Sequence, residues 1–197
     1  MHVVAFNGSP HKNGNTARLI RHCLETLESE GITTEMVQVG GVNVRGCCAC
    51  LTCRKKGLET CAITSDPVNE WIEKMKNADG IILGSPVFMF GVTPEMKALI
   101  DRASFIARGR VRRGEKGSMF YRKVGGAVCA VRRAGAVQAL HSMISMFAVT
   151  QMIVPMSNYW TLGMGEAPGE VENDAEGWLS MEELGRNMAW VMKKINA

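Results

Sequence analysis

The chain has 197 residues, of which 46% are hydrophobic and 21% are charged, and its formal net charge is +4. This size and composition predict one globular domain, spanning residues 1–197, with a substantial core. The charge is too small to indicate a nucleic-acid partner. No stretch approaches the roughly 18 apolar residues that a membrane span needs, and the opening MHVVAFNGSP differs from a signal peptide. We therefore expect a cytoplasmic protein without a membrane partner.

Apolar runs and helical periodicities alternate along the chain. The runs that predict strands are 2–6, 33–39, 79–86, 122–131 and 150–156. The segments that predict helices are 15–30, 67–77, 93–107, 134–149 and a last helix from about Gly177 to the end. Asp66-Pro67 and Thr93-Pro94 are typical helix starts. The alternation predicts an α/β fold, with a doubly wound, five-stranded parallel sheet between two layers of helices.

The loop after the first strand, NGSPHKNGNT (7–16), has the composition of a phosphate-binding loop. Ligands of such folds lie at the carboxyl ends of the strands. Gly8 and Gly14 permit a tight backbone, and a helix N-terminus follows directly. The hydrogen-bonding side chains of the loop are Ser9, Asn13, Asn15 and Thr16. Five residues separate the glycines and no Lys follows the second, so this is not a Walker loop. A polar turn that caps the helix is the alternative.

Two stretches carry a family resemblance. GSPHKNGNT (8–16) and ADGIILGSPVFMFGVTPEMKALIDRA (78–103) resemble the flavin loops of the flavodoxin-like NADPH-dependent FMN reductase superfamily, in particular its iron–sulfur flavoproteins. With the cysteine segment between them, the similarity is colinear to about residue 130. The resemblance implies a flavodoxin-like fold that binds FMN.

The resemblance also implies particular flavin-binding residues. The phosphate loop maps onto Ser9, His11, Asn13, Asn15 and Thr16. The loop along the isoalloxazine ring maps onto Pro86, Val87, Phe88, Met89, Phe90 and Gly91. Apolar side chains there suit one face of a flat ring, and Gly91 would let the backbone reach the polar ring edge. A buried hydrophobic turn is the alternative for this loop.

A third flavin loop is expected near residues 130–138. The family often has small residues there, whereas this chain has Arg132 and Arg133. We assign Arg132 to the cofactor site, where it would stabilise a reduced anionic flavin or hold a nicotinamide phosphate. Solvent-facing arginines are the alternative interpretation.

Five of the seven cysteines lie within fifteen positions, in a loop at 46–62. An odd number of cysteines in a reducing compartment argues against disulfides. Cys47, Cys50, Cys53 and Cys61 are spaced C-x2-C-x2-C-x7-C. Successive two-residue gaps are typical of ferredoxin segments, whereas zinc sites usually pair two C-x-x-C units. The spacing therefore favours an iron–sulfur cluster over zinc or bare thiols.

The family resemblance implies that this cluster is a 4Fe-4S cluster, ligated by those four cysteines. Cys48 has no role in the family pattern, although it could replace Cys47 as a ligand. Cys23 and Cys129 lie in apolar elements and are expected to be core residues.

The segment between Arg102 and Lys123 contains eight Lys or Arg residues and one acid, Glu115. Either this is a solvated loop or it binds an anionic partner. We expect it to dock an acidic ferredoxin-like donor through Arg110, Arg112 and Arg113.

The sequence thus predicts a flavin-dependent oxidoreductase whose cofactors, rather than catalytic side chains, carry the chemistry. Electrons would pass from a ferredoxin-like donor or NAD(P)H, through FMN and the cluster, to a small acceptor such as a quinone, oxygen or peroxide. The alternatives are a cluster-free NAD(P)H-dependent FMN or quinone reductase and a non-redox sensing module. The family tends to form homodimers or homotetramers. The loop at 158–170, with Tyr159 and Trp160, would cover a neighbour's flavin, and a flexible surface loop is the alternative.

Overall fold

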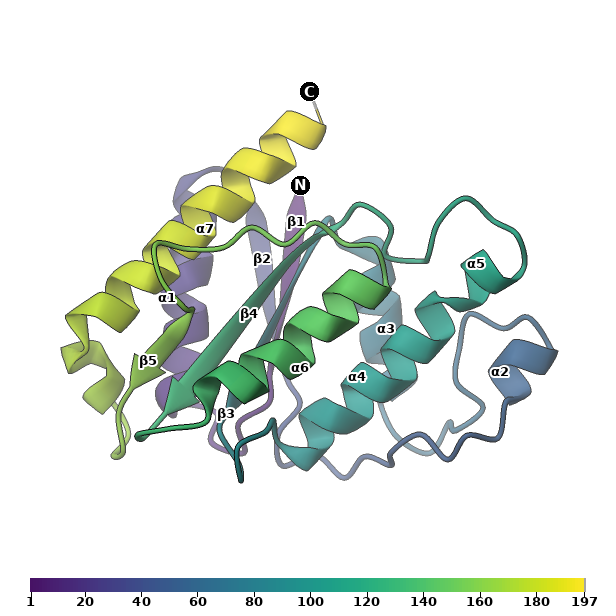
Figure 1. Cartoon of the computed structure of the whole chain (residues 1–197), viewed down its shortest axis with the longest axis horizontal. Helices are drawn as coiled ribbons and strands as arrows, with labels where there is room; N and C mark the ends of the chain where they lie inside the picture. The colour runs from purple at the N-terminus through teal and green to yellow at the C-terminus, as the bar shows by residue number, and fades with distance from the viewer. Residues whose placement is uncertain (197) are drawn as a thin grey trace.

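A computed structural model describes residues 1–196, which form a five-stranded sheet between two layers of helices (Figure 1). The strands are β1 (His2–Asn7), β2 (Thr33–Gln38), β3 (Gly80–Pro86), β4 (Val124–Val131) and β5 (Leu162–Met164). The helices are α1 (Asn15–Ser29), α2 (Thr52–Lys55), α3 (Val68–Asn77), α4 (Pro94–Ala107), α5 (Gly109–Arg112), α6 (Ala136–Val149), the 3-10 helix η1 (Glu170–Asn173) and α7 (Ala175–Ile195). The strands are parallel in the order β2-β1-β3-β4-β5, which confirms the flavodoxin-like, doubly wound sheet.

Each face of the sheet packs against its own helices. Helices α1 and α7 cover one face, and α3, α4 and α6 cover the other (Figure 1). The central strands are buried on both faces, which explains their continuous apolar runs. Cys23 and Cys129 are fully buried, and burial raises the pKa of each thiol to about 12, so both are confirmed as core residues. None of the helices within residues 1–196 is long and apolar enough to cross a membrane.

Helix starts follow the capping residues seen in the sequence. Thr93 precedes α4, and its hydroxyl accepts a hydrogen bond from the Met96 N–H at 3.4 Å. The last helix begins slightly before the predicted Gly177, because the Asp174 carboxylate accepts the Gly177 N–H at 3.0 Å. Polar caps therefore fix these helix starts more closely than the hydrophobic pattern does.

The prediction of a fifth strand at 150–156 is wrong. Only Ile153 of that segment pairs with the sheet edge, where its carbonyl accepts the Gly125 N–H at 2.8 Å. Pro155 has no N–H for a strand ladder, and the chain leaves the sheet there. It rejoins at Thr161, and β5 follows inside the segment that was expected to be a loop.

A buried ion pair attaches the long connection between β2 and α3 to α4. Arg102 of α4 is 1% exposed, and its Nη1 donates to Asp66 Oδ2 at 2.6 Å. Nη1 also donates to the Arg45 carbonyl and Nη2 to the Ile63 carbonyl, each at 3.0 Å. The Asp66 carboxylate in turn accepts the N–H groups of Arg45 at 3.1 Å and Val68 at 3.3 Å. Arg102 and Asp66 thus hold both ends of the segment that contains the five clustered cysteines.

The surroundings of Asp66 lower its pKa. Burial alone would raise the pKa of this carboxyl, but hydrogen bonds from Arg102 and from the Arg45 and Val68 N–H groups outweigh that effect. A carboxyl whose folded-state pKa lies below its unfolded value stabilises the fold at neutral pH. Its contribution is lost as the pH falls through the folded-state pKa.

Replacing Asp66 by Asn should therefore destabilise the protein in a pH-dependent way. At pH 7 we expect the free energy of unfolding, measured by urea denaturation, to fall by about 3–5 kcal/mol, because Arg102 keeps a buried charge without its partner. The matched control is Asp101→Asn, which removes an exposed pair with Lys97 on the same helix and should cost less than about 1 kcal/mol. The difference between the wild type and Asp66→Asn should shrink below about pH 4. Equal stabilities at pH 7, or a difference that does not change with pH, would contradict this assignment.

Candidate functional site

A cavity of about 260 Å³ lies at the carboxyl ends of β1, β3 and β4. In this fold the strand order reverses between β1 and β3, which is where ligands bind. Seven of the predicted flavin-binding residues line the cavity: Ser9, His11, Asn15, Thr16, Pro86, Val87 and Arg132. The structure therefore brings together parts of all three predicted flavin loops. Asn13 and the four residues from Phe88 to Gly91 lie outside this lining.

Close backbone packing holds the loop after β1 in place. The Gly8 N–H donates to the Gly84 carbonyl at 2.7 Å, and the Thr93 hydroxyl donates to the Gly8 carbonyl at 2.8 Å. A Cβ on Gly8 would lie 2.9 Å from the Gly84 oxygen, so only glycine permits this approach. On the other side, Gln38 Nε2 donates to the Ser9 carbonyl at 2.6 Å. Loops that follow three different strands are thus joined into one cavity wall.

This wall presents hydrogen-bond donors at the start of α1. The backbone N–H groups of Asn15 and Thr16 have no partner among residues 1–196, as expected in the first turn of a helix. Within the same range the Thr16 hydroxyl also has none, although Thr16 is 1% exposed. Ser9 Oγ accepts the His11 N–H at 3.2 Å, which leaves its own proton for a ligand. Free N–H groups, hydroxyls and a positive helix end are the features that bind a phosphate group.

Neither asparagine side chain offers a free donor to the cavity. The Asn15 amide bonds the loop after β5, donating to the Ala167 carbonyl at 3.0 Å and accepting the Gly169 N–H at 2.7 Å. Asn13 Oδ1 accepts from Arg21 at 2.7 Å and lies outside the cavity. Asn15 therefore fixes a cavity wall, and its backbone rather than its side chain faces a ligand.

The loop after β3 forms a tight turn with exposed apolar side chains. Phe88 and Gly91 exchange two backbone hydrogen bonds of 2.9 Å, and the residues between them, Met89 and Phe90, have φ angles of 45° and 63°. Met89 is 92% exposed and Phe90 59%, so the alternative of a buried turn is wrong. The Gly91 N–H and C=O both bond Phe88, and the expected backbone contact with a ring edge stays a prediction. The aromatic and thioether side chains remain free to cover a flat ligand.

The loop after β5 is a cavity wall that the sequence did not reveal. Gly165, Glu166 and Pro168 line the cavity, and the Glu166 carboxylate pairs with Arg132 Nε at 3.0 Å. The Arg132 side chain is 74% exposed, so this is a surface ion pair at the cavity mouth. The only sequence signal was the Gly-rich stretch 158–170, which was expected to cover a neighbouring subunit.

Aromatic residues of that stretch differ in exposure. Trp160 packs against the core and contacts the His141 ring edge-on at 5.8 Å between centroids, so it does not stand out from the surface as expected. Tyr159 is exposed. Both line a second cavity, of about 410 Å³, together with Arg133.

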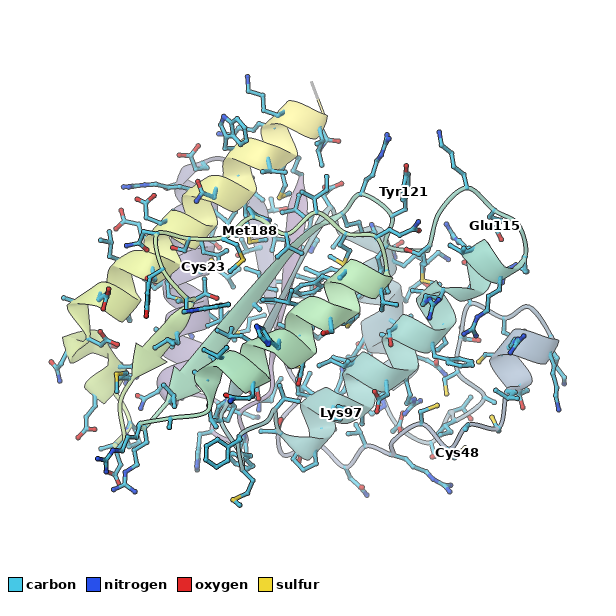
Figure 2. The ribbon with its side chains drawn as sticks, in the orientation of Figure 1. Cys23, Cys48, Lys97, Glu115, Tyr121 and Met188 are labelled. Carbon is cyan, nitrogen blue, oxygen red and sulfur yellow. The ribbon has the colours of Figure 1, made fainter. Side chains whose placement is uncertain are left out.

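The clustered cysteines divide into an exposed arm and an anchored pair. All are free thiols; Cys47, Cys48 and Cys50 are exposed, whereas Cys53 and Cys61 are half-buried against the core. Figure 2 shows Cys48 on the outer edge of the loop. In the described part of the chain, no three Cys, His, Asp or Glu side chains are gathered closely enough to hold a metal ion. Binding a cluster would therefore require the exposed arm to close toward the anchored pair.

Electrostatic coupling shows which thiols lie near one another. Burial raises the pKa of Cys53, and the neighbouring Cys61 and Cys50 raise it further. Burial lowers the pKa of Arg102, but Asp66 and Cys61 outweigh it and raise the pKa. Cys61 thus lies beside a buried guanidinium. Four soft thiolate donors in one loop fit iron–sulfur chemistry.

The basic segment is largely neutralised by local contacts. Arg110 Nη2 donates to Glu59 at 3.1 Å, and this pairing lowers the pKa of Glu59 to about 2. Arg113 pairs with Glu115 at 2.7 Å, while Arg112 lies over a phenylalanine ring. Two of the three arginines expected to dock a partner are therefore already paired. The neighbouring cysteine loop adds a run of exposed cations: Arg54, Lys55 and Lys56.

Known proteins match the chain in both sequence and fold. Residues 1–167 match the family described as NADPH-dependent FMN reductase. The chain is 37% identical to an iron-sulfur flavoprotein of Methanocaldococcus jannaschii, covering 99% of each chain. It is 30% identical to an iron-sulfur flavoprotein of Methanosarcina thermophila, covering 99% of this chain and 97% of the relative.

A solved structure described as a flavodoxin, WrbA-like protein from Agrobacterium tumefaciens superposes with a TM-score of 0.64 at 15% identity. The match covers 98% of this chain and 97% of that one, which supports the flavodoxin-like fold. The sequence matches extend the same conclusion to the family: the chain belongs to the NADPH-dependent FMN reductase family and is one of its iron–sulfur flavoproteins.

Proposed function

We propose that this protein is a flavin-dependent oxidoreductase that binds FMN in the cavity at the carboxyl ends of β1, β3 and β4. The observation that carries this proposal is the cavity itself, where a donor-rich helix start lies opposite the loops that follow β3 and β4. The backbone N–H groups of Asn15 and Thr16, with the hydroxyls of Ser9 and Thr16, would hold the phosphate. The exposed turn of Phe88, Met89 and Phe90 would cover the ring.

The cysteine loop is proposed to hold a 4Fe-4S cluster through Cys47, Cys50, Cys53 and Cys61. The donor chemistry and spacing support this, since three thiolates follow at two-residue gaps and a fourth comes from the anchored end. A bound cluster would supply one-electron transfer beside the two-electron chemistry of the flavin. The chain would then pass electrons between a donor and a small acceptor. Relatives named iron-sulfur flavoproteins add support.

The electron donor is proposed to be an acidic, ferredoxin-like protein, with NAD(P)H as the alternative. The supporting feature is the run Arg54-Lys55-Lys56, which is exposed and follows Cys53 directly. Charge complementarity at such a surface mainly accelerates association. The segment expected from the sequence has fewer unpaired cations, because Arg110 and Arg113 already pair with acids.

Self-association as a homodimer or homotetramer is part of the same proposal. The turn of Phe88, Met89 and Phe90 exposes large apolar side chains next to the cavity. Contiguous apolar surface of this kind is usually covered by a ligand or a partner. A second copy of the chain would cover whatever part of the turn the flavin leaves exposed.

Replacing Thr16 by Val should weaken FMN binding selectively. The change keeps the side-chain shape but removes the hydroxyl, and a hydrogen bond to a charged group contributes about 1.5–3 kcal/mol, so the Kd for FMN should rise at least about tenfold. Quenching of flavin fluorescence measures this Kd. Riboflavin, which lacks the phosphate, should bind both proteins equally.

The control for that experiment is Thr26→Val on the same helix, where the hydroxyl donates to the His22 carbonyl at 3.1 Å. It should leave FMN affinity unchanged. An unchanged Kd for FMN in Thr16→Val, or an equal loss for riboflavin, would place the phosphate elsewhere.

Neutralising the exposed cations of the cysteine loop should slow reduction by a ferredoxin. In the triple variant Arg54→Gln, Lys55→Gln, Lys56→Gln, the second-order rate constant from stopped-flow absorbance should fall about tenfold or more at low salt and converge with the wild type at high salt. Arg186→Gln is the control, because it removes a cation from α7, on the other face of the sheet. Rates that match at every salt concentration would exclude this surface. Rapid bleaching of the flavin by NAD(P)H alone would favour the cluster-free reductase.

A further inference from the structure

The guanidinium of Arg102 has one nitrogen without a partner. Nη1 and Nη2 donate to Asp66, Arg45 and Ile63, but Nε is buried and bonds nothing within residues 1–196. A buried donor without an acceptor costs stability, and such groups are rare in folded proteins. The unused Nε therefore points to an acceptor that the present arrangement does not supply.

Cys61 is the neighbouring group that can become this acceptor. It is half-buried against the core and lies two residues before Ile63, whose carbonyl accepts the hydrogen bond from Arg102 Nη2 at 3.0 Å. Its backbone is fixed from α3, since the Cys61 N–H donates to Asn69 Oδ1 at 2.7 Å and Asn69 Nδ2 donates to the Cys61 carbonyl at 3.0 Å. A neutral thiol is a weak acceptor, whereas a thiolate is a strong one. A Cys61 sulfur that ligates a metal would complete the set of partners around Arg102, whose Nε is buried without an acceptor.

Arg102 also connects the two candidate sites through α4. That helix begins at Thr93, whose hydroxyl bonds the Gly8 carbonyl in the wall of the flavin cavity. Arg102 lies nine residues later, about 13 Å along the helix axis. A single rigid element therefore positions the phosphate loop at one end and the cysteine loop farther along.

We propose that Arg102 is a positioning residue for the cluster: its Nη atoms hold both ends of the cysteine loop, and its Nε donates to the Cys61 sulfur when that sulfur is a ligand. This inference rests on the proposed function, because it concerns the cluster assigned to that loop. Guanidinium stays protonated at all ordinary pH values. A hydrogen bond from it to a ligating sulfur withdraws negative charge and raises the reduction potential.

The direct test compares Arg102→Met and Arg102→Lys with the wild type after anaerobic purification. Arg102→Met should contain less iron and sulfide per chain, and its remaining cluster should have a more negative reduction potential and an altered EPR spectrum. Arg102→Lys, which keeps the charge, should recover part of the potential but not full loading, because an ammonium cannot span both loop ends. FMN content should not change. Lys97→Met is the control, since Lys97 lies on the outer surface of α4 (Figure 2) and forms only an exposed pair.

A second readout uses iron-free protein and does not depend on the cluster. Amide hydrogen exchange at Arg45 and Cys61 should be at least about tenfold faster in both Arg102 variants, because the loop ends lose their anchor. Wild-type protein without iron would refute the proposed function. The exchange comparison would still test whether Arg102 holds both ends of the cysteine loop. If Arg102→Met does not fold, Arg102→Lys supplies the same comparisons. Unchanged exchange, or a residual cluster with wild-type potential and EPR spectrum in both variants, would overturn the inference.

Discussion

The guanidinium of Arg102, buried in α4, donates hydrogen bonds to the Asp66 carboxylate and to two backbone carbonyls. All three acceptors belong to the long loop between β2 and α3. Burying the Arg102–Asp66 pair carries a desolvation cost, which is offset only because every oxygen of Asp66 and two nitrogens of Arg102 find partners. The loop has only the four-residue α2 as regular structure between Gln38 and Val68. Loops of that length are uncommon in compact domains unless they serve a function. The ion pair explains how this one is held against the core while its cysteines stay near the surface.

In the proposed flavin cavity, backbone groups and short polar side chains join the loops. Gly8 allows the β1 loop to contact β3, Thr93 joins it to α4, and Asn15 joins it to the loop after β5. These bonds leave the first turn of α1 with free N–H groups, which is the chemistry that an anionic group requires. Helix α4 takes part in both arrangements. The proposed phosphate loop and the cysteine loop are thereby fixed to one rigid element.

Local rules account for most of what the sequence predicted. Apolar runs identified β1, β3 and β4, β-favouring residues identified β2, and Thr-Pro predicted the start of α4, because these signals depend on neighbouring residues only. The β5 error has a local cause as well: the run TQMIVPM is apolar enough for a strand, but Pro155 ends the pairing that Ile153 begins.

The remaining differences depend on partners far apart in the sequence. Arg102 was counted with a basic surface segment, and only the fold brings Asp66, 36 residues earlier, into contact with it. Asn15 was expected to contact a ligand, but the fold places the loop after β5 against its amide. Glu166 had no distinguishing pattern around it. Some polar residues of a ligand cavity bond other loops, and others face the ligand. The sequence alone does not distinguish these two roles.

The central claim is that one chain holds a flavin and a cluster that share electrons. Anaerobic protein should be assayed for iron, sulfide and FMN, and titrated with a reductant under the same conditions. The account predicts about four irons and four sulfides per FMN, and uptake of about three electrons per FMN, two by the flavin and one by the cluster. Cys53→Ala should lose the iron and take up about two electrons, whereas Cys48→Ala should behave as the wild type. Wild-type protein with FMN but no iron, taking up only two electrons, would contradict the account and describe a simple flavin reductase.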